Sequence, residues 1–444
     1  MERVFKPRIE QQTQKVIVGI DFGTSFTKVY FDQGGEIKQP LKFNVGGKQS
    51  FFLPTILFYN PGENKLYIHK KDNCLVLRYF KYSMINDNLI TSNKLKTNNK
   101  NLEVRPEFLC SIFFLAFLIK YIKSQITGII KTTDIEYTIN MGCPIENYAD
   151  KNKDAYTKAL SVAYQLSEIV SDGMAIEDLM IFYNSNHLNH FSFLQTIPEL
   201  YAEALWFIEQ PSTGEGIYTI LDIGGGTVDF ASIYVTRTDE GEKKTTIYSQ
   251  RVMPLGIEIL LKKMYPEESL KEREKCINHL KKSRVIVPDG WEPKHNNNRK
   301  LKIVREFDNG FAMGIAEVKE RIQWIMDKQN TERKYIPYYS FGGGADFNWY
   351  HSIIDSLASR FLPANIPPFK RQKVILNNIP DNRLIIAEQL TRSNFPNIEG
   401  FPWQFIREHI FSGIERDEPF NKDIAPGSDA WPEMEARHKE RFPD

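Results

Sequence analysis

Residues 218–235 read YTILDIGGGTVDFASIYV, and this stretch decides the fold. β-Branched and aromatic residues on both sides predict two strands, Tyr218–Leu221 and Val228–Val235, joined by a tight corner. The corner holds three consecutive glycines, which cost roughly 1 kcal/mol each relative to alanine inside a regular element. Two carboxylates, Asp222 and Asp229, flank them. A corner this costly between two good strands indicates a function, although a glycine-rich bulge is the plainer alternative.

A second hairpin of the same kind is predicted near the N-terminus. Strands at 16–20 and 27–31 flank the corner DFGTS at 21–25. Glycine lets the backbone approach a ligand and lets successive N–H groups converge on an anion. Asp21 would repel a phosphate, so it fits such a site only with a cation between them, typically Mg²⁺. One motif used twice indicates an internal duplication of a βββαβα unit, although the first segment alone could also be an ordinary hairpin turn.

A third glycine-rich segment, FGGGA at 341–345, follows a predicted strand and leads into a predicted helix. Backbone N–H groups at the start of a helix favour anions, and the absent side chains would let a flat ring lie against the chain. By itself the segment is unspecific. As the third member of an ordered set, it gains meaning.

The ordered set resembles the phosphate-1, phosphate-2 and adenosine motifs of the superfamily that contains actin, sugar kinases and heat-shock chaperones. Connecting segments agree: NMGCP at 140–144, PELYA at 198–202 and RLIIA at 383–387 look like their chaperone counterparts. The closest resemblance is to the nucleotide-binding domain of the seventy-kilodalton chaperones (Hsp70-like, DnaK-type). It covers about residues 15–390, and YFKY at 79–82 is similar to a divergent branch without the usual peptide-binding domain.

The resemblance implies an α/β fold of two actin-like ATPase lobes, each a ribonuclease-H-like unit. The expected organisation is an N-terminal arm at 1–14, lobe I at 15–212 with an insert at 49–105, lobe II at 213–400 with an insert at 257–333, and an aromatic, acidic tail at 401–444. The aromatic rings of the tail either complete the second lobe or dock a partner.

The resemblance also implies a site for ATP or ADP with Mg²⁺. Asp21, Asp222 and Asp229 would position the metal, and Glu199 would orient the attacking water. Lys81 would reach the γ-phosphate, unless it is simply a solvated lysine. The implied nucleotide contacts are Gly23, Thr24, Ser25, Gly224, Gly225, Gly226, Thr227, Gly256, Lys281, Lys282, Gly342, Gly343 and Gly344. Of these, the lysine pair could equally lie on an exposed helix face.

Two departures from the chaperone pattern stand out. Asp346 occupies the place of an arginine that stacks on the base, and Phe347 is the expected replacement. No β-rich peptide-binding domain follows residue 390, so chaperoning through such a domain is not expected. We find no P-loop, nucleophile elbow or histidine metal motif.

Composition agrees with a protein of the cytoplasm. The 444 residues carry 57 basic and 56 acidic side chains, which argues against nucleic acid or an anionic membrane as a bulk electrostatic partner. Four scattered cysteines and a polar N-terminus predict a reducing compartment and no signal peptide. The apolar stretch LCSIFFLAFL at 109–118 predicts a buried helix, since a membrane span needs about 20 such residues.

The sequence therefore predicts a slow ATPase that acts as a conformational switch on a partner protein. Three alternatives stay open: an actin-like filament protein, a small-molecule kinase, and a nucleotide-binding scaffold without turnover.

Overall fold

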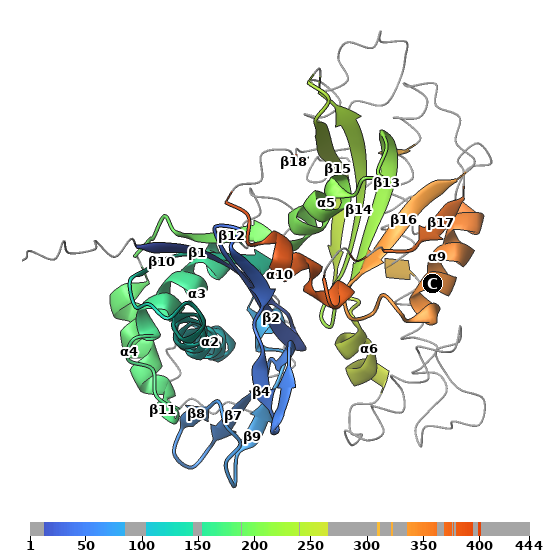
Figure 1. Cartoon of the computed structure of the whole chain (residues 1–444). Helices are drawn as coiled ribbons and strands as arrows, with labels where there is room; N and C mark the ends of the chain where they lie inside the picture. Colours follow the sequence, from blue (N-terminus) through green and yellow to red (C-terminus); the bar gives the residue numbers. More distant parts are fainter. Residues whose placement is uncertain are drawn as a thin grey trace, which may run out of the picture.

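The computed structural model describes residues 13–84, 104–144, 153–187, 189–238, 240–264, 309–310, 321–322, 335–361, 368–374, 376, 379–393 and 398–400. The fold class is α/β, as expected, with two six-stranded mixed sheets and two smaller sheets (Figure 1). Most of the predicted arm and of the predicted insert at 257–333 lies outside the described residues, as do the tail, Lys281 and Lys282.

The first large sheet has the order β3-β2-β1-β10-β12, with β6 pairing β2 at one end. Its strands are β1 (Gln14–Phe22), β2 (Phe26–Gln33), β3 (Ile37–Pro40), β6 (Leu53–Pro54), β10 (Ile135–Cys143) and β12 (Leu194–Pro198). The first three form an antiparallel meander, and β10 and β12 then add in parallel to β1.

The second large sheet repeats this arrangement as β15-β14-β13-β16-β17, with β18 added beside β15. Its strands are β13 (Gly216–Ile223), β14 (Val228–Arg237), β15 (Lys243–Met253), β16 (Ile336–Phe341), β17 (Phe369–Gln372) and β18 (Ile398–Gly400). Again an antiparallel meander is followed by two parallel strands. The strand directions and order match, so the two large sheets share one strand topology.

Helices connect the parallel strands in both units, since a parallel connection must cross the sheet. They are α2 (Pro106–Ile130), α3 (Lys153–Leu166) and α4 (Ile176–Asn186) in the first unit, and α6 (Ile257–Met264) and α9 (Asn348–Phe361) in the second. A four-stranded sheet of β7 (Leu57–Asn60), β8 (Lys65–Tyr67), β9 (Leu75–Leu77) and β11 (Met174–Ala175) lies beside the first unit, with the pair β4 (Phe43–Val45) and β5 (Lys48–Ser50) and the short helix α1 (Phe80–Ser83).

Helix α2 is the predicted apolar helix, and it is longer than the sequence indicated. Pro106 occupies its first turn, where a missing N–H costs nothing, and Lys131 ends it in a left-handed conformation. By length and composition it could cross a membrane, yet 67% of its most apolar window is buried inside the protein. Side chains such as Phe113 and Phe114 pack in the core beneath the first sheet, so α2 is a core helix.

Two helices cross between the units. Helix α5 (Glu199–Glu209) follows the first sheet but packs on the second, where the Trp206 and Phe341 rings meet with 5.4 Å between centroids. Helix α10 (Ile385–Gln389) follows the second sheet but packs on the first. Gly19 permits this, because a Cβ there would lie 2.1 Å from the Ala387 carbonyl oxygen.

Side chains of the first sheet also hold the end of α10. Asn140 Nδ2 donates hydrogen bonds to the carbonyl oxygens of Leu390 at 2.7 Å and Arg392 at 2.9 Å. Each sheet is thus covered by a helix from the other half of the chain, and these two helices, α5 and α10, also pack against each other (Figure 1).

Candidate functional site

The first predicted corner lies between β1 and β2. Asp21 is buried near the end of β1, and the register sets Lys28 directly opposite on β2. The Lys28 Nζ atom lies 2.5 Å from Asp21 Oδ2, so the carboxylate is neutralised by its cross-strand neighbour. Gly23 is required at the turn, because a Cβ there would lie 2.2 Å from the Phe26 carbonyl oxygen.

The second corner lies between β13 and β14, and its backbone is held from behind. The register sets Asp222 directly opposite Asp229. The N–H groups of Gly256, Ile257 and Glu258 donate to the carbonyls of the three glycines at 224–226, at 3.2, 3.1 and 2.8 Å. Gly256 therefore supports the loop, where a Cβ would lie 2.5 Å from Gly225 backbone atoms.

The structure brings the two corners into contact. A Cβ at Gly225 would lie 2.2 Å from Ser25 Oγ, and one at Gly226 would lie 2.6 Å from Thr24 Oγ1. The predicted phosphate-binding residues of both hairpins thus lie together, and glycine at positions 225 and 226 leaves room for those hydroxyl groups. Thr227 completes the second turn by accepting a hydrogen bond from the Gly224 N–H at 2.9 Å.

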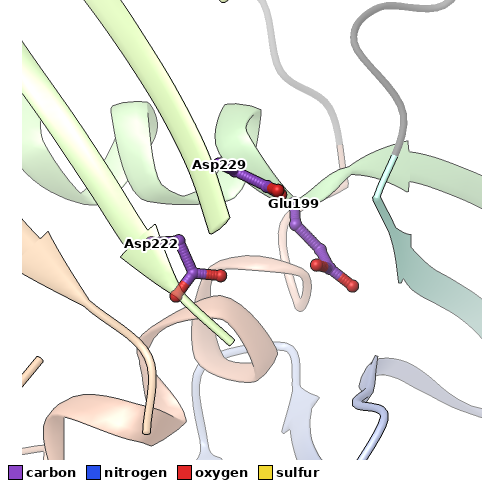
Figure 2. Close-up of side chains that lie close together, drawn as sticks. All are labelled: Glu199, Asp222 and Asp229. Carbon is purple, nitrogen blue, oxygen red and sulfur yellow. The ribbon is translucent and has the colours of Figure 1, made fainter. Parts of the chain in front are cut away.

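Three carboxyl groups gather beside these corners. Glu199, at the start of α5, joins Asp222 and Asp229, and one oxygen of each lies within 4.8 Å of the others (Figure 2). All three side chains are buried. Among the described residues, Asp222 Oδ1 and Asp229 Oδ1 have no hydrogen-bond partner. Mg²⁺ takes oxygen ligands, carboxylates among them, so these residues could hold the predicted cation.

Burial and mutual repulsion raise the pKa values of this cluster. Burial first, and then the Glu199 and Asp21 carboxylates, raise the pKa of Asp222 from 3.8 to about 7, against the opposing effect of Lys28 and Lys81. Burial also raises the pKa of Asp229 well above its usual value, helped by Asp222 and Glu199. Ionisation of the second corner is therefore costly unless a cation is bound there.

Lys81 is not the solvated lysine that the sequence left possible. It lies on α1, is buried, and its Nζ atom donates to Glu199 Oε1 at 2.9 Å. Its Nζ also lies 5.6 Å from the centre of the Phe22 ring. Burial favours the neutral amine, but the Glu199 and Asp21 carboxylates outweigh it and raise the pKa of Lys81. The ammonium group is thus held charged against Glu199.

The pKa of Glu199 itself is raised above 4.5. Burial is the main cause, Lys81 opposes it, and Asp21 adds to it. The Glu199 carboxyl group therefore lies between the Lys81 ammonium group and the carboxyl groups of Asp222 and Asp229.

The third glycine segment lies against the second corner. Gly342 has a φ of 79°, and a Cβ there would lie 2.0 Å from Asp222 Oδ1. Gly344 N–H donates to the Ile223 carbonyl at 2.8 Å. Gly343 faces open space, beside a cavity of about 620 Å³ between this segment and the chain that follows β17.

The predicted role of Phe347 is wrong. Only 2% of this side chain is exposed, because it packs inward where the chain enters α9, so it is not available to stack on a base. The segment also does not pass directly into a helix: Phe347 N–H already bonds the Gly344 carbonyl at 2.9 Å, and α9 begins at Asn348.

Sequence reasoning missed Glu203. It lies one turn after Glu199 on α5, it is fully buried, and neither carboxyl oxygen has a partner among the described residues. Burial, with Asp222 and Asp229, raises its pKa well above 4.5. The four-residue helical spacing from Glu199 was the available signal. Lys28 was missed as well, although it follows Asp21 at the same interval as Asp229 follows Asp222.

No model of a known protein family matches this chain, and a search of curated proteins finds no significant match. Function therefore has to be inferred from the site itself.

Proposed function

We propose that this protein is an ATP-binding, slowly hydrolysing conformational switch with two actin-like lobes. One observation carries the proposal: three glycine segments, distant in sequence, meet around buried carboxylates with unpaired oxygens. A nucleotide triphosphate complexed with Mg²⁺ has the two features that such a site needs. Its phosphate oxygens accept hydrogen bonds from the backbone N–H groups of glycine turns, and its cation neutralises the carboxylates.

Different residues of this chain would bind the metal, bind the phosphates and accept the proton. Asp21, Asp222 and Asp229 would hold Mg²⁺, which supplies positive charge to the phosphates. Thr24, Ser25 and the glycines of the second corner would bind the phosphate oxygens. Glu199, fixed by Lys81, would accept a proton from the attacking water, a task suited to a carboxyl group whose pKa lies above 4.5.

The repeated topology and the crossed helices support a switch. Each sheet is covered by a helix from the other half, so a ligand between the corners would move α5 and α10 together with the sheets. A protein partner that senses this movement, and a place in the cytoplasm, belong to the same proposal.

Thermal melting tests the proposal. At about 100 times Kd, a ligand that binds only the folded state adds about 2.7 kcal/mol to stability. Millimolar ATP with Mg²⁺ should raise the melting temperature by several degrees, and ATP with a chelator should raise it much less. Asp222→Asn should remove the shift, whereas Glu36→Gln, at an exposed acid, should keep it. An unchanged melting temperature in a concentration range that stabilises a control ATPase would refute the proposal.

A further inference from the structure

The cavity beside Gly343 has an unusual lining. One wall is the bare backbone of Gly342 and Gly343, and the facing chain brings three basic side chains, Arg371, Lys373 and Arg383. At about 620 Å³ it falls within the range of small-molecule sites, and it adjoins the corner that holds Asp222. A nucleoside attached to phosphates at that corner would extend into it.

The guanidinium group of Arg383 is already held by contacts within the protein. Its Nε and Nη2 atoms donate to the two Asp381 oxygens at 2.8 and 2.6 Å. Its guanidinium lies 3.9 Å from the centre of the Phe52 ring. With its edge paired and one face covered, Arg383 is a structural link between the start of α10 and the first unit.

Arg371 is held differently. It lies on β17, the strand next to β16, and its Nη2 atom donates to the Ala345 carbonyl oxygen. This bond places the guanidinium at the end of the glycine segment, one residue before Asp346. The side chain is otherwise exposed, and no second hydrogen bond or ion pair holds it within the described part of the chain. One edge of the guanidinium is therefore held, and the exposed side chain lines the cavity.

We propose that the base of the bound nucleotide stacks on the guanidinium face of Arg371, with the bare backbone of Gly342 and Gly343 on the other side of the ring. This rests on the proposed nucleotide site. A planar guanidinium attracts the face of an aromatic ring, and glycine leaves room for it. Lys373, a point charge on a flexible stem, lacks that plane.

Binding of ATP and of inorganic tripolyphosphate, each with Mg²⁺, tests the assignment. Arg371→Ala should weaken ATP roughly 5- to 30-fold, as expected for a stacked cation, and leave tripolyphosphate unchanged. Arg371→Lys keeps the charge but not the plane, so it should weaken ATP nearly as much. Lys373→Ala removes a charge from the same cavity and should change ATP binding less than about twofold. Adding Asp346→Arg to Arg371→Ala returns a guanidinium to the cavity and should recover part of the loss.

Equal ATP affinity in wild type and Arg371→Ala would overturn the assignment, as would an equal loss of tripolyphosphate binding. A wild-type protein that binds neither compound would overturn the nucleotide site as well, so the two failures are distinguishable. Melting of each variant without ligand checks that the fold is intact.

Discussion

In the hairpin β1–β2 the register sets Lys28 opposite Asp21, whereas in β13–β14 it sets Asp229 opposite Asp222. The two hairpins occupy the same position in the two repeated sheets, and each carries its first aspartate near the end of the first strand. In one, opposite charges pair at 2.5 Å. In the other, like charges face each other in a buried setting, an arrangement that destabilises a sheet.

The difference lies in how much of each hairpin's charge the protein itself neutralises. In the first hairpin the carboxylate of Asp21 already has Lys28 beside it. The second has unpaired oxygens and raised pKa values, so it is relieved only by protons or by a bound cation. The two hairpins thus share one topology but differ in charge. In the first, the balanced hairpin, a lysine pairs with the carboxylate, whereas in the second two carboxyl groups face each other.

The largest expected effect breaks the contact between the hairpins. Gly225→Val places methyl groups against Ser25, whose Oγ would lie 2.2 Å and whose Cβ would lie 3.3 Å from the new Cβ. The phosphate path closes, so we expect stabilisation by ATP and Mg²⁺ to disappear in a melting assay. Gly128→Ala, where a Cβ meets nothing within 4 Å, is the matched control. Full ligand stabilisation of Gly225→Val would show that the corners do not bind phosphate.

The next effect concerns Glu199, which accepts a hydrogen bond from Lys81 and lies beside Asp222 and Asp229. Glu199→Gln keeps the shape and the contact with Lys81 but is a poor base. We expect hydrolysis to slow by roughly 10²- to 10⁴-fold while ATP affinity changes little. Single-turnover kinetics and equilibrium binding on the same samples separate the two quantities, and a wild-type rate in this variant would remove Glu199 from the chemistry.

The smallest effect is on stability and pH. A carboxyl group with a folded pKa of about 7 and an unfolded value of 3.8 holds its proton more tightly when folded. It stabilises the fold fully below about pH 4, and this stability is lost as the pH rises through 7. We expect the ligand-free protein to lose several degrees of melting temperature between pH 5 and 8, and Asp229→Asn to reduce that slope.

Lys28→Gln gives the opposite sign, and so sharpens the comparison. It removes the cation from the balanced hairpin and should lower the melting temperature at pH 8, where Asp229→Asn should raise it. Melting curves across this pH range, with and without Mg²⁺, check both variants. If both shift the melting temperature in the same direction, the contrast between the hairpins is wrong.

Much of the architecture could be predicted because it depends on local pattern. β-Branched and aromatic residues around glycine corners predicted both hairpins, and an apolar run after Pro106 predicted α2. The features that the sequence did not predict depend on contacts between segments that are distant in the chain or on packing in the folded protein. Phe347 is aromatic and lies two residues after the third glycine segment, but packing at the start of α9 turns it inward. Arg371 reaches Ala345 because β17 pairs with β16. The spacing of these residues in the sequence does not predict that pairing.

The hydrogen bonds from Asn140 to Leu390 and Arg392 have a consequence for synthesis. Asn140 and Leu390 are 250 positions apart, yet α10 covers the face of the first sheet at Gly19. At 5–20 residues per second, a ribosome needs roughly 12–50 s to travel that far. Once β12 has also been made, the first sheet has all its described strands but still lacks α10. We expect the nascent chain to stay incompletely folded until α10 has left the ribosome, so the two halves mature together.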